Sequence, residues 1–309
     1  MSPTHAPKVL LEGLLFPEGP RWHEGRLWFS DIHQHRVMTV DLEGKPAVVA
    51  ECFFRPSGLG FLPDGNAIVV DMLNRRVMRI EDGSPKEHVG LSNLASAACN
   101  DMVMDTQGRA YVSSLGRRGP PDTPRPSELR PFPPHILEYF IEAGVANTPE
   151  TSEIMRIDPD GSTHLAADGV LSPNGMVITS DGNTLIVAET YANRLSSFDI
   201  AKDGSLSNKR VFAEVGHAMP DGICLDAEGA IWMASPYTHE FLRVHKGGEI
   251  ADRITLPEGK LAVACMLGGD DRQTLFLCTS IRPTRLIVPG ITHGFIETVR
   301  VAVPGTGQP

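Results

Sequence analysis

The segment Asn174-Gly-Met-Val-Ile-Thr-Ser-Asp-Gly182 recurs along this chain with the same internal spacing. A polar residue precedes a glycine, a short apolar run follows, and a second glycine comes seven residues after the first. The same pattern occurs in Ser57-Gly-Leu-Gly-Phe-Leu-Pro-Asp-Gly65 and Asp221-Gly-Ile-Cys-Leu-Asp-Ala-Glu-Gly229. Each apolar run has the length and residue types of one β-strand. The repeat therefore predicts an all-β protein.

Three further segments extend the series. The copy at Asn100 has Asp101 in place of the first glycine, the copy at Glu18 is one residue shorter, and a degenerate copy lies near Cys265. The copies begin near residues 18, 57, 100, 174, 221 and 265, so most intervals measure 39 to 47 residues. A period of about 40–50 residues with roughly four strands per unit is typical of a β-propeller. We therefore expect one six-bladed β-propeller domain over residues 1–309.

The two ends of the chain also look like strands of one blade. Lys8-Val-Leu-Leu11 is apolar, and Gly294-Phe-Ile-Glu-Thr-Val-Arg-Val-Ala302 alternates apolar and polar residues. We expect these two segments to pair and close the ring, because closure removes an exposed sheet edge.

One interval is longer than the others, because 74 residues separate the copies at Asn100 and Asn174. The excess lies around residues 116–151 and is rich in proline and arginine. Long insertions in compact domains are often binding loops. We expect either a lid over one face of the propeller or a decorative loop.

The composition is that of an ordinary globular protein, with 41% hydrophobic and 21% charged residues. The net charge of −10, without any basic run, argues against nucleic acid as a partner. No apolar run approaches the ~18 residues of a membrane span, and residues 1–15 lack the pattern of a secretory signal. The five cysteines include no CxxC pair. We expect a cytoplasmic protein with buried free thiols; a disulfide or a cysteine metal site is the alternative.

The residue before each repeat glycine, called the repeat slot below, carries the chemistry. The inner strand of every blade lines the central channel, so the slot side chains should converge there. They are Glu18, Ser57, Asn100, Asn174, Asp221 and roughly Cys265. Two carboxylates without a Lys or Arg in any slot would repel each other, and buried charges need partners. Oxygen ligands from Glu, Asp and Asn around a divalent cation would remove this repulsion. Alternatively, these residues only cap strands.

All-oxygen ligation suits Ca²⁺, Mg²⁺ or Mn²⁺. Zn²⁺ usually prefers nitrogen or sulfur, although carboxylates can also hold it. Two other sets of polar residues are weaker candidates for a metal site or a channel position. His33 and His35 form a His-x-His pair, for which the alternatives are a metal pair and a solvated turn between strands; we expect the turn. Glu189 follows a strand, where it either approaches the channel or lies at the surface.

Four short motifs give the chain a family resemblance. Phe16-Pro-Glu-Gly-Pro20, Asn100-Asp101, Pro173-Asn-Gly-Met176 and Pro220-Asp-Gly222, in this order, resemble the senescence marker protein/gluconolactonase (regucalcin-like) family. The resemblance runs from about residue 12 to 280. It implies a six-bladed propeller with one catalytic divalent metal, and hydrolysis of a lactone.

The resemblance also implies roles for individual residues. Glu18, Asn174 and Asp221 match the metal ligands, and Asn100 matches a residue that contacts the substrate beside the metal. A metal can polarise the lactone carbonyl and lower the pKa of a bound water, and Asp221 is the expected base that accepts the water's proton. Ca²⁺ or Zn²⁺ is the expected ion, with Mn²⁺ or Mg²⁺ as alternatives. Asp101 and His217 are further candidates for substrate contact, although Asp101, one residue beyond its slot, could instead face the blade.

The chain departs from the family pattern at Ala98. Sugar-lactone members carry an arginine at this position, two residues before the matching Asn, so the lactone or ester substrate need not be a sugar lactone. Two other functions remain open. One is a phosphotriester hydrolase of the diisopropyl fluorophosphatase type, and the other is a calcium- or ligand-binding propeller without turnover.

Overall fold

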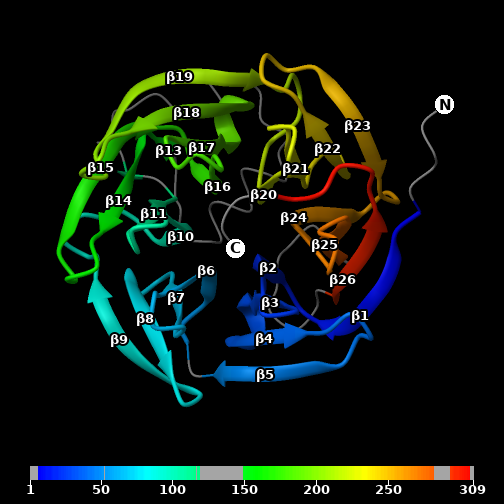
Figure 1. Ribbon diagram of the computed structural model, residues 1–309, viewed down its shortest axis with the longest axis horizontal. Helices are drawn as coiled ribbons and strands as arrows, with labels where there is room; N and C mark the ends of the chain where they lie inside the picture. Colours follow the sequence, from blue (N-terminus) through cyan, green and yellow to red (C-terminus); the bar gives the residue numbers. More distant parts are fainter. Residues whose placement is uncertain (1–5, 52, 116, 119–148, 282–292, 307–309) are drawn as a thin grey trace.

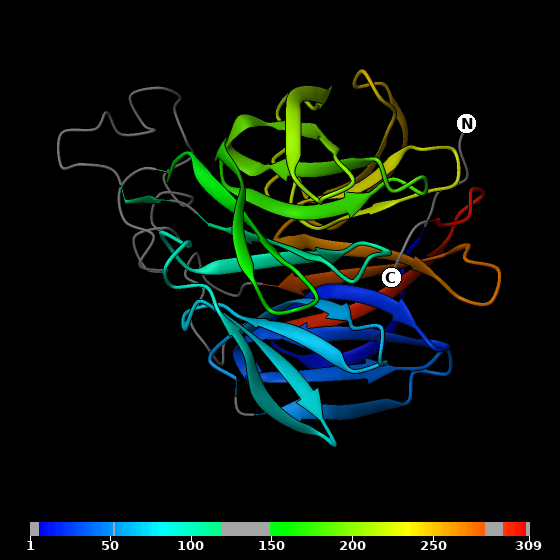
Figure 2. The ribbon, with the colours of Figure 1, turned by 60° about the vertical axis from the view of Figure 1, so that its left-hand side comes forward.

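Six four-stranded antiparallel sheets surround a central axis in the computed structural model (Figures 1 and 2). The structure describes residues 6–51, 53–115, 117–118, 149–281 and 293–306. The first three blades are β2 (Pro17–His23), β3 (Arg26–Asp31), β4 (Arg36–Val40) and β5 (Pro46–Glu51); β6 (Pro56–Phe61), β7 (Ala67–Asp71), β8 (Arg76–Glu81) and β9 (Ser84–Gly90); and β10 (Cys99–Met104), β11 (Ala110–Ser114), β14 (Ser152–Ile157) and β15 (Thr163–Val170).

The other three blades complete the ring. They are β16 (Pro173–Ile178), β17 (Thr184–Glu189), β18 (Arg194–Ile200) and β19 (Leu206–Glu214); β20 (Ile223–Leu225), β21 (Ile231–Ser235), β22 (Glu240–Val244) and β23 (Ile250–Thr255); and β24 (Lys260–Gly268), β25 (Thr274–Ile281), β26 (His293–Arg300) and β1 (Lys8–Leu14). The sixth blade joins both ends of the chain, because β1 pairs antiparallel with β26. The predicted six-bladed propeller and its predicted closure are confirmed.

Short connections follow two of the second strands. The 3-10 helices η1 (Ile32–Gln34) and η2 (Thr190–Ala192) come directly after β3 and β17. His33 and His35 lie in the first of these turns, as expected, and His33 contacts the ring of Phe16 at a centroid distance of 5.3 Å. The predicted insertion begins and ends with a two-stranded ribbon of β12 (Arg117–Arg118) and β13 (Pro149–Glu150). The rest of the predicted lid, residues 119–148, lies outside the described residues.

Glycines after the repeat slots allow neighbouring inner strands to lie unusually close together. A Cβ on Gly175 would stand 2.6 Å from the Asp221 carbonyl oxygen, and one on Gly222 would stand 2.3 Å from the Ala264 Cβ. Side chains do not fit at such distances, so glycine is needed for steric reasons. The repeat pattern thus reflects packing around the channel.

The sixth repeat is offset from its expected register. Gly222 N donates to the Val263 carbonyl at 3.0 Å, and Gly222 packs against Ala264, so Val263 occupies the sixth slot. The expected residue, Cys265, lies two positions further along β24, where its Sγ is 3.8 Å from the Cys224 Sγ. The first four blades have a similar register shift after their slots, so the offset comes from the poor match of the sixth copy to the repeat. Because Val263 is apolar, the sixth blade adds no polar slot side chain.

Buried groups at the ends of the second strands fix the loops that lead into the inner strands. In three blades a carboxylate accepts a hydrogen bond from a backbone N–H of that loop. The pairs are Asp31 with Phe16 (2.9 Å), Asp71 with Phe54 (2.7 Å) and Glu189 with Leu171 (2.7 Å). Each carboxylate also pairs with the arginine five residues later, namely Arg36, Arg76 and Arg194. This repeated arrangement holds the start of each inner strand, where the slot residue follows.

Glu189 belongs to this set, so both expectations for it are wrong. Its side chain is fully buried, and it pairs with Arg194 at 3.0 Å and Lys209 at 3.1 Å. Burial opposes its ionisation, but hydrogen bonds from Ser196 and Leu171 and these two cations outweigh that effect and lower its pKa. Glu189 therefore supports the loop before Asn174 and faces neither solvent nor channel.

The C-terminal segment crosses the other end of the axis. Gly305 N donates to the Arg272 carbonyl at 2.8 Å, and Thr306 N donates to the Leu225 carbonyl, at the end of β20, at 3.2 Å. In Figure 1 the red segment after β26 runs toward β20. Since the slots lie at the start of the inner strands, this segment covers the opposite end of the channel.

The described cysteines match the expectation of free thiols. Cys99, Cys224, Cys265 and Cys278 are buried and unbridged, and burial raises the pKa of Cys99 to about 12. Cys52 lies outside the described residues. Among those residues, no helix is long and apolar enough to cross a membrane.

Candidate active site

The polar slot residues stand where the inner strands begin. Glu18, Asn100 and Asn174 belong to β2, β10 and β16, and Asp221 comes shortly before β20. Glu18 and Asn100 are nearly buried, with 6% and 7% of their surface exposed, whereas Asn174 and Asp221 are half-buried. The set therefore has a deep carboxylate and a more accessible one.

A chain of side-chain hydrogen bonds orients the two amides. The Asn100 Nδ2 donates to the Asn174 Oδ1 at 2.9 Å, and the Ser57 hydroxyl donates to the Asn100 Oδ1 at 3.3 Å. The Asn174 Nδ2 in turn donates to the Thr190 hydroxyl at 3.4 Å, which itself donates to the Pro220 carbonyl at 2.8 Å. The chain connects blades two to five and fixes the direction of both amide oxygens. Ser57 occupied a slot for which the sequence predicted no role, and no sequence pattern pointed to Thr190.

The predicted repulsion between carboxylates is present at Glu18. Its pKa lies well above the usual value, because the side chain is buried and because the charges of Asp221 and Asp101 oppose its ionisation. A hydrogen bond from Gly19 N at 2.6 Å and the charge of Arg21 act in the opposite direction but do not compensate. A cation beside Glu18 would stabilise the ionised form.

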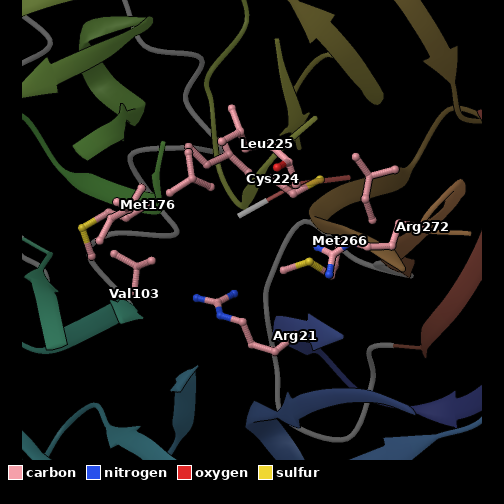
Figure 3. Close-up of a pocket in the computed structure, with 12 residues that line it drawn as sticks. Arg21, Val103, Met176, Cys224, Leu225, Met266 and Arg272 are labelled. Carbon is pink, nitrogen blue, oxygen red and sulfur yellow. The ribbon is translucent and has the colours of Figure 1, made fainter. Parts of the chain in front are cut away.

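Arg21 is a channel residue that the repeat pattern missed. Its side chain extends from β2 toward the axis (Figure 3), is 6% exposed, and donates to the Pro20 carbonyl at 2.7 Å and to the Met102 carbonyl. Arg21 is the third residue after its slot, and the third residues after the slots of blades three to five, Val103, Val177 and Cys224, also line the channel. Comparing one position per repeat could not reveal a residue three places further on.

Asp101 also lies at the channel. Burial raises its pKa, and the attraction of Arg21 works against this rise. Its backbone N–H donates to the Ser113 hydroxyl at 3.0 Å, which fixes the strand. Asp101 therefore lies beside Glu18 and Arg21 at the edge of the candidate site, and its contact with substrate stays a prediction.

Two small cavities follow the axis. The cavity at the slot end of the channel, called the upper cavity, measures about 10 Å³. It is lined by Glu18, Asp101 and the glycines after the slots of blades four and five. The lower one, about 20 Å³, is lined mainly by apolar side chains and reaches Arg272 and Thr306 (Figure 3). Arg21, Met176 and Ile223 line both cavities, and Arg21 is the charged residue among them.

The donor set fits a hard divalent cation by its chemistry. Among the described residues, no group of three or more His, Cys, Asp or Glu side chains is placed to hold a metal ion. The candidate set consists instead of two carboxylates, Glu18 and Asp221, and one amide oxygen, that of Asn174. Amide oxygens have two lone pairs, so the hydrogen bond from Asn100 leaves Asn174 able to bind a cation. Oxygen-only sites of this kind suit Ca²⁺ and related ions.

His217 is placed differently from the other predicted residues. It is exposed and lies in a turn closed by a hydrogen bond of 3.1 Å from Ala218 N to the Val215 carbonyl. The turn precedes Asp221 by three residues. Substrate contact through His217 stays a prediction.

Comparisons with known proteins agree with this architecture. The chain is 28% identical over 294 residues to regucalcin of Danio rerio, which covers 91% of this chain and 88% of that protein. It is 26% identical over 271 residues to a pentonolactonase of Haloferax volcanii, with 85% and 81% covered. Among solved structures, a calcium-binding regucalcin of Agrobacterium tumefaciens matches with a TM-score of 0.75 at 21% identity, over 99% and 97% of the two chains.

A gluconolactonase of Xanthomonas campestris matches with a TM-score of 0.70 at 21% identity, over 96% and 89% of the chains. At such identities the two structures support the fold alone. The family is shown by a different comparison, which covers most of the chain and includes all four motifs described above. Residues 16–281 match the model of the SMP-30/gluconolactonase/LRE-like region, so the chain belongs to this family.

Proposed function

We propose that this protein is a divalent-metal-dependent lactonase. The observation that carries the proposal is the meeting of Glu18 and Asp221 at one end of the channel, beside the oriented oxygen of Asn174. Relatives named pentonolactonase and 6-deoxy-6-sulfogluconolactonase support lactone hydrolysis as the reaction. Glu18, Asn174 and Asp221 would hold the cation, which is Ca²⁺ or Zn²⁺ in the first instance.

The remaining chemistry follows from the positions of the side chains. When bound, the cation would polarise the lactone carbonyl and lower the pKa of the attacking water. Asp221 is the more accessible carboxylate, so it can accept the water's proton and return a proton to the ring oxygen that leaves. The water oxygen joins the carbonyl carbon, the ring C–O bond breaks, and a hydroxy acid forms.

Asn100 would orient the substrate. An amide nitrogen carries two hydrogens, and the bond to Asn174 uses one of them. The second can bind an oxygen of the lactone. Because the Ser57 hydroxyl holds the Asn100 oxygen, the amide is already directed before substrate arrives.

The surroundings favour a lactone with an apolar substituent. A cluster of Tyr191, Met219, Leu171 and Tyr237 packs beside the loops that lead to Asn174 and Asp221. Ala98 offers no charged group at the position where sugar-lactone members carry arginine. Apolar contacts reward apolar substituents, whereas discrimination for hydroxyl groups requires polar partners.

A hydrolysis screen of the purified protein tests the proposal. The substrates would be lactones of different ring size and hydrophobicity, with phosphotriesters in parallel, after chelation and after addition of Ca²⁺, Zn²⁺, Mn²⁺ or Mg²⁺. We expect lactone hydrolysis to disappear on chelation and return with metal, and Asp221→Asn to lower the rate by about 10²–10⁴-fold. Asp270→Asn, an exposed change in a distant turn, is the matched control.

Three other outcomes would contradict the proposed function. Full activity in protein shown to be free of metal would remove the metal from the mechanism. Faster hydrolysis of phosphotriesters would change the reaction class. Tight Ca²⁺ binding without hydrolysis of any substrate would make the protein a binding propeller; the matching regucalcin of Agrobacterium tumefaciens is described as calcium-binding.

A further inference from the structure

More negative than positive side chains lie at the upper cavity. Glu18 and Asp101 line it from β2 and β10, and Asp221 lies close enough to oppose the ionisation of Glu18. Among the described residues that line this cavity, Arg21 is the one cation. Three carboxylates and one guanidinium leave two negative charges when all four groups are ionised.

Arg21 is held firmly in this arrangement. Its guanidinium donates to the backbone carbonyls of Pro20 and Met102, which belong to two different blades. The strongest charge acting on it is that of Asp101, followed by that of Glu18. Since it also lines the lower cavity, it lies between the carboxylates and the apolar part of the channel. Both hydrogen bonds go to backbone atoms, so the positive charge remains available to balance Asp101.

We propose that Arg21 is a positioning residue that sets the charge of the cation the site selects. By balancing Asp101, it leaves the charge of two carboxylates, which matches a divalent ion. This inference rests on the proposed function, because it assumes that Glu18, Asn174 and Asp221 hold a cation. Without Arg21 the site would present a third uncompensated carboxylate, and a trivalent ion would gain more from that charge than a divalent one.

The test measures cation binding and does not depend on the substrate. Metal-free protein would be titrated calorimetrically with Ca²⁺ and with Tb³⁺, an ion of similar size, and the ratio of the two affinities compared between variants. We expect Arg21→Met to raise the preference for Tb³⁺ over Ca²⁺ by about tenfold or more. Arg21→Lys, which keeps the charge, should keep the wild-type ratio, and Arg21→Met with Asp101→Asn should restore it.

Two further variants make the result decisive. Asp101→Asn alone keeps the shape of the side chain and removes one negative charge, so it should shift the ratio toward Ca²⁺, even if Arg21→Met fails to fold. Arg272→Met, in the lower cavity, should leave the ratio unchanged. An unchanged ratio in Asp101→Asn, or a shift in the double variant equal to that in Arg21→Met, would overturn the inference. A wild-type protein that binds neither ion would instead contradict the proposed metal site itself.

Discussion

The Asn100 Nδ2 donates a hydrogen bond of 2.9 Å to the Asn174 Oδ1, across 74 residues of sequence. The two residues belong to different blades, so the contact forms only when the ring is assembled. The bond joins blades three and four at the start of their inner strands and directs the Asn174 oxygen. Alone, Pro173-Asn174-Gly175 reads as a turn; in the ring it presents an oriented ligand.

Replacing Asn174 should therefore affect metal binding more than folding. We expect Asn174→Ala to weaken Ca²⁺ binding by about tenfold or more, because one oxygen ligand is lost, while the unfolding temperature of the metal-free protein changes little. Calorimetry and thermal unfolding would measure the two effects. Asn183→Ala, an exposed turn asparagine in the same blade, is the control. A large loss of stability with unchanged metal affinity would return Asn174 to a purely structural role.

The raised pKa of Glu18 predicts how the stability of the metal-free protein depends on pH. A carboxyl whose pKa is higher in the folded than in the unfolded state binds more protons when folded. Its stabilising contribution is fully present below the unfolded value, about 4.5, and is lost as the pH rises through the raised folded value. With a chelator present, the unfolding temperature of wild type relative to Glu18→Gln should therefore fall from pH 4.5 to pH 8.

Addition of Ca²⁺ at pH 8 separates this effect from general pH dependence. The ion should restore stability to wild type and much less to Glu18→Gln, because it stabilises the ionised carboxylate. Parallel pH profiles of the two metal-free proteins would contradict the prediction.

Gly222 should tolerate no side chain. Gly222→Ala would place its Cβ 2.3 Å from the Ala264 Cβ and 2.6 Å from the Ala264 Cα, so the two inner strands must separate. We expect a loss of about 1–3 kcal/mol in the free energy of unfolding, measured with urea. Gly90→Ala, where the nearest atom is 3.7 Å away, is the control. Equal stabilities of the two variants would show that the strands adapt without cost.

Glu189→Gln should destabilise the fourth blade. The amide would keep the shape of the side chain but leave Arg194 and Lys209 without their counter-charge. Loss of these charged contacts should cost about 1–3 kcal/mol in a urea titration. Glu214→Gln, an exposed change in the same blade, should have little effect. A wild-type urea midpoint in Glu189→Gln would mean that Glu189 does not support the loop.

Ala98→Arg should move the substrate preference toward sugar lactones. Ala98 is half-buried and lies two residues before Asn100. Its carbonyl accepts a hydrogen bond of 2.9 Å from Leu115 N, which fixes the backbone at this position. An arginine there would add donors for substrate hydroxyls. We expect kcat/KM for an aldonolactone to rise about tenfold relative to an apolar lactone. Ala98→Met, which adds length without charge, is the control, and an equal shift in both variants would argue against hydroxyl recognition.

The sequence was sufficient for the architecture because a propeller repeats. Equivalent positions in six copies must occupy equivalent places around one axis, so the spacing of polar residue and glycine predicted the blades, the contact of Asn100 with Asn174 and the proximity of Glu18 to Asp221. The same logic explained the glycines, which allow strands such as β16 and β20 to approach. The closing pair of β1 and β26 followed from the need to cover sheet edges.

Departures from the repeat were decided only in three dimensions. The sixth blade carries Val263 where the sequence pattern placed Cys265. Blade one carries Arg21 at the position where blades three, four and five carry Val103, Val177 and Cys224, which line the same cavity. The pattern of polar residue and glycine describes one position per blade, so it does not reveal a charge one or three residues further on. The contacts of Glu189 and Thr190 likewise join segments that share no motif. Periodicity thus determined where the blades and slots lie, whereas the charges that meet at the channel depended on tertiary packing, because Asp101 and Arg21 lie outside the slots yet line the same cavity as Glu18.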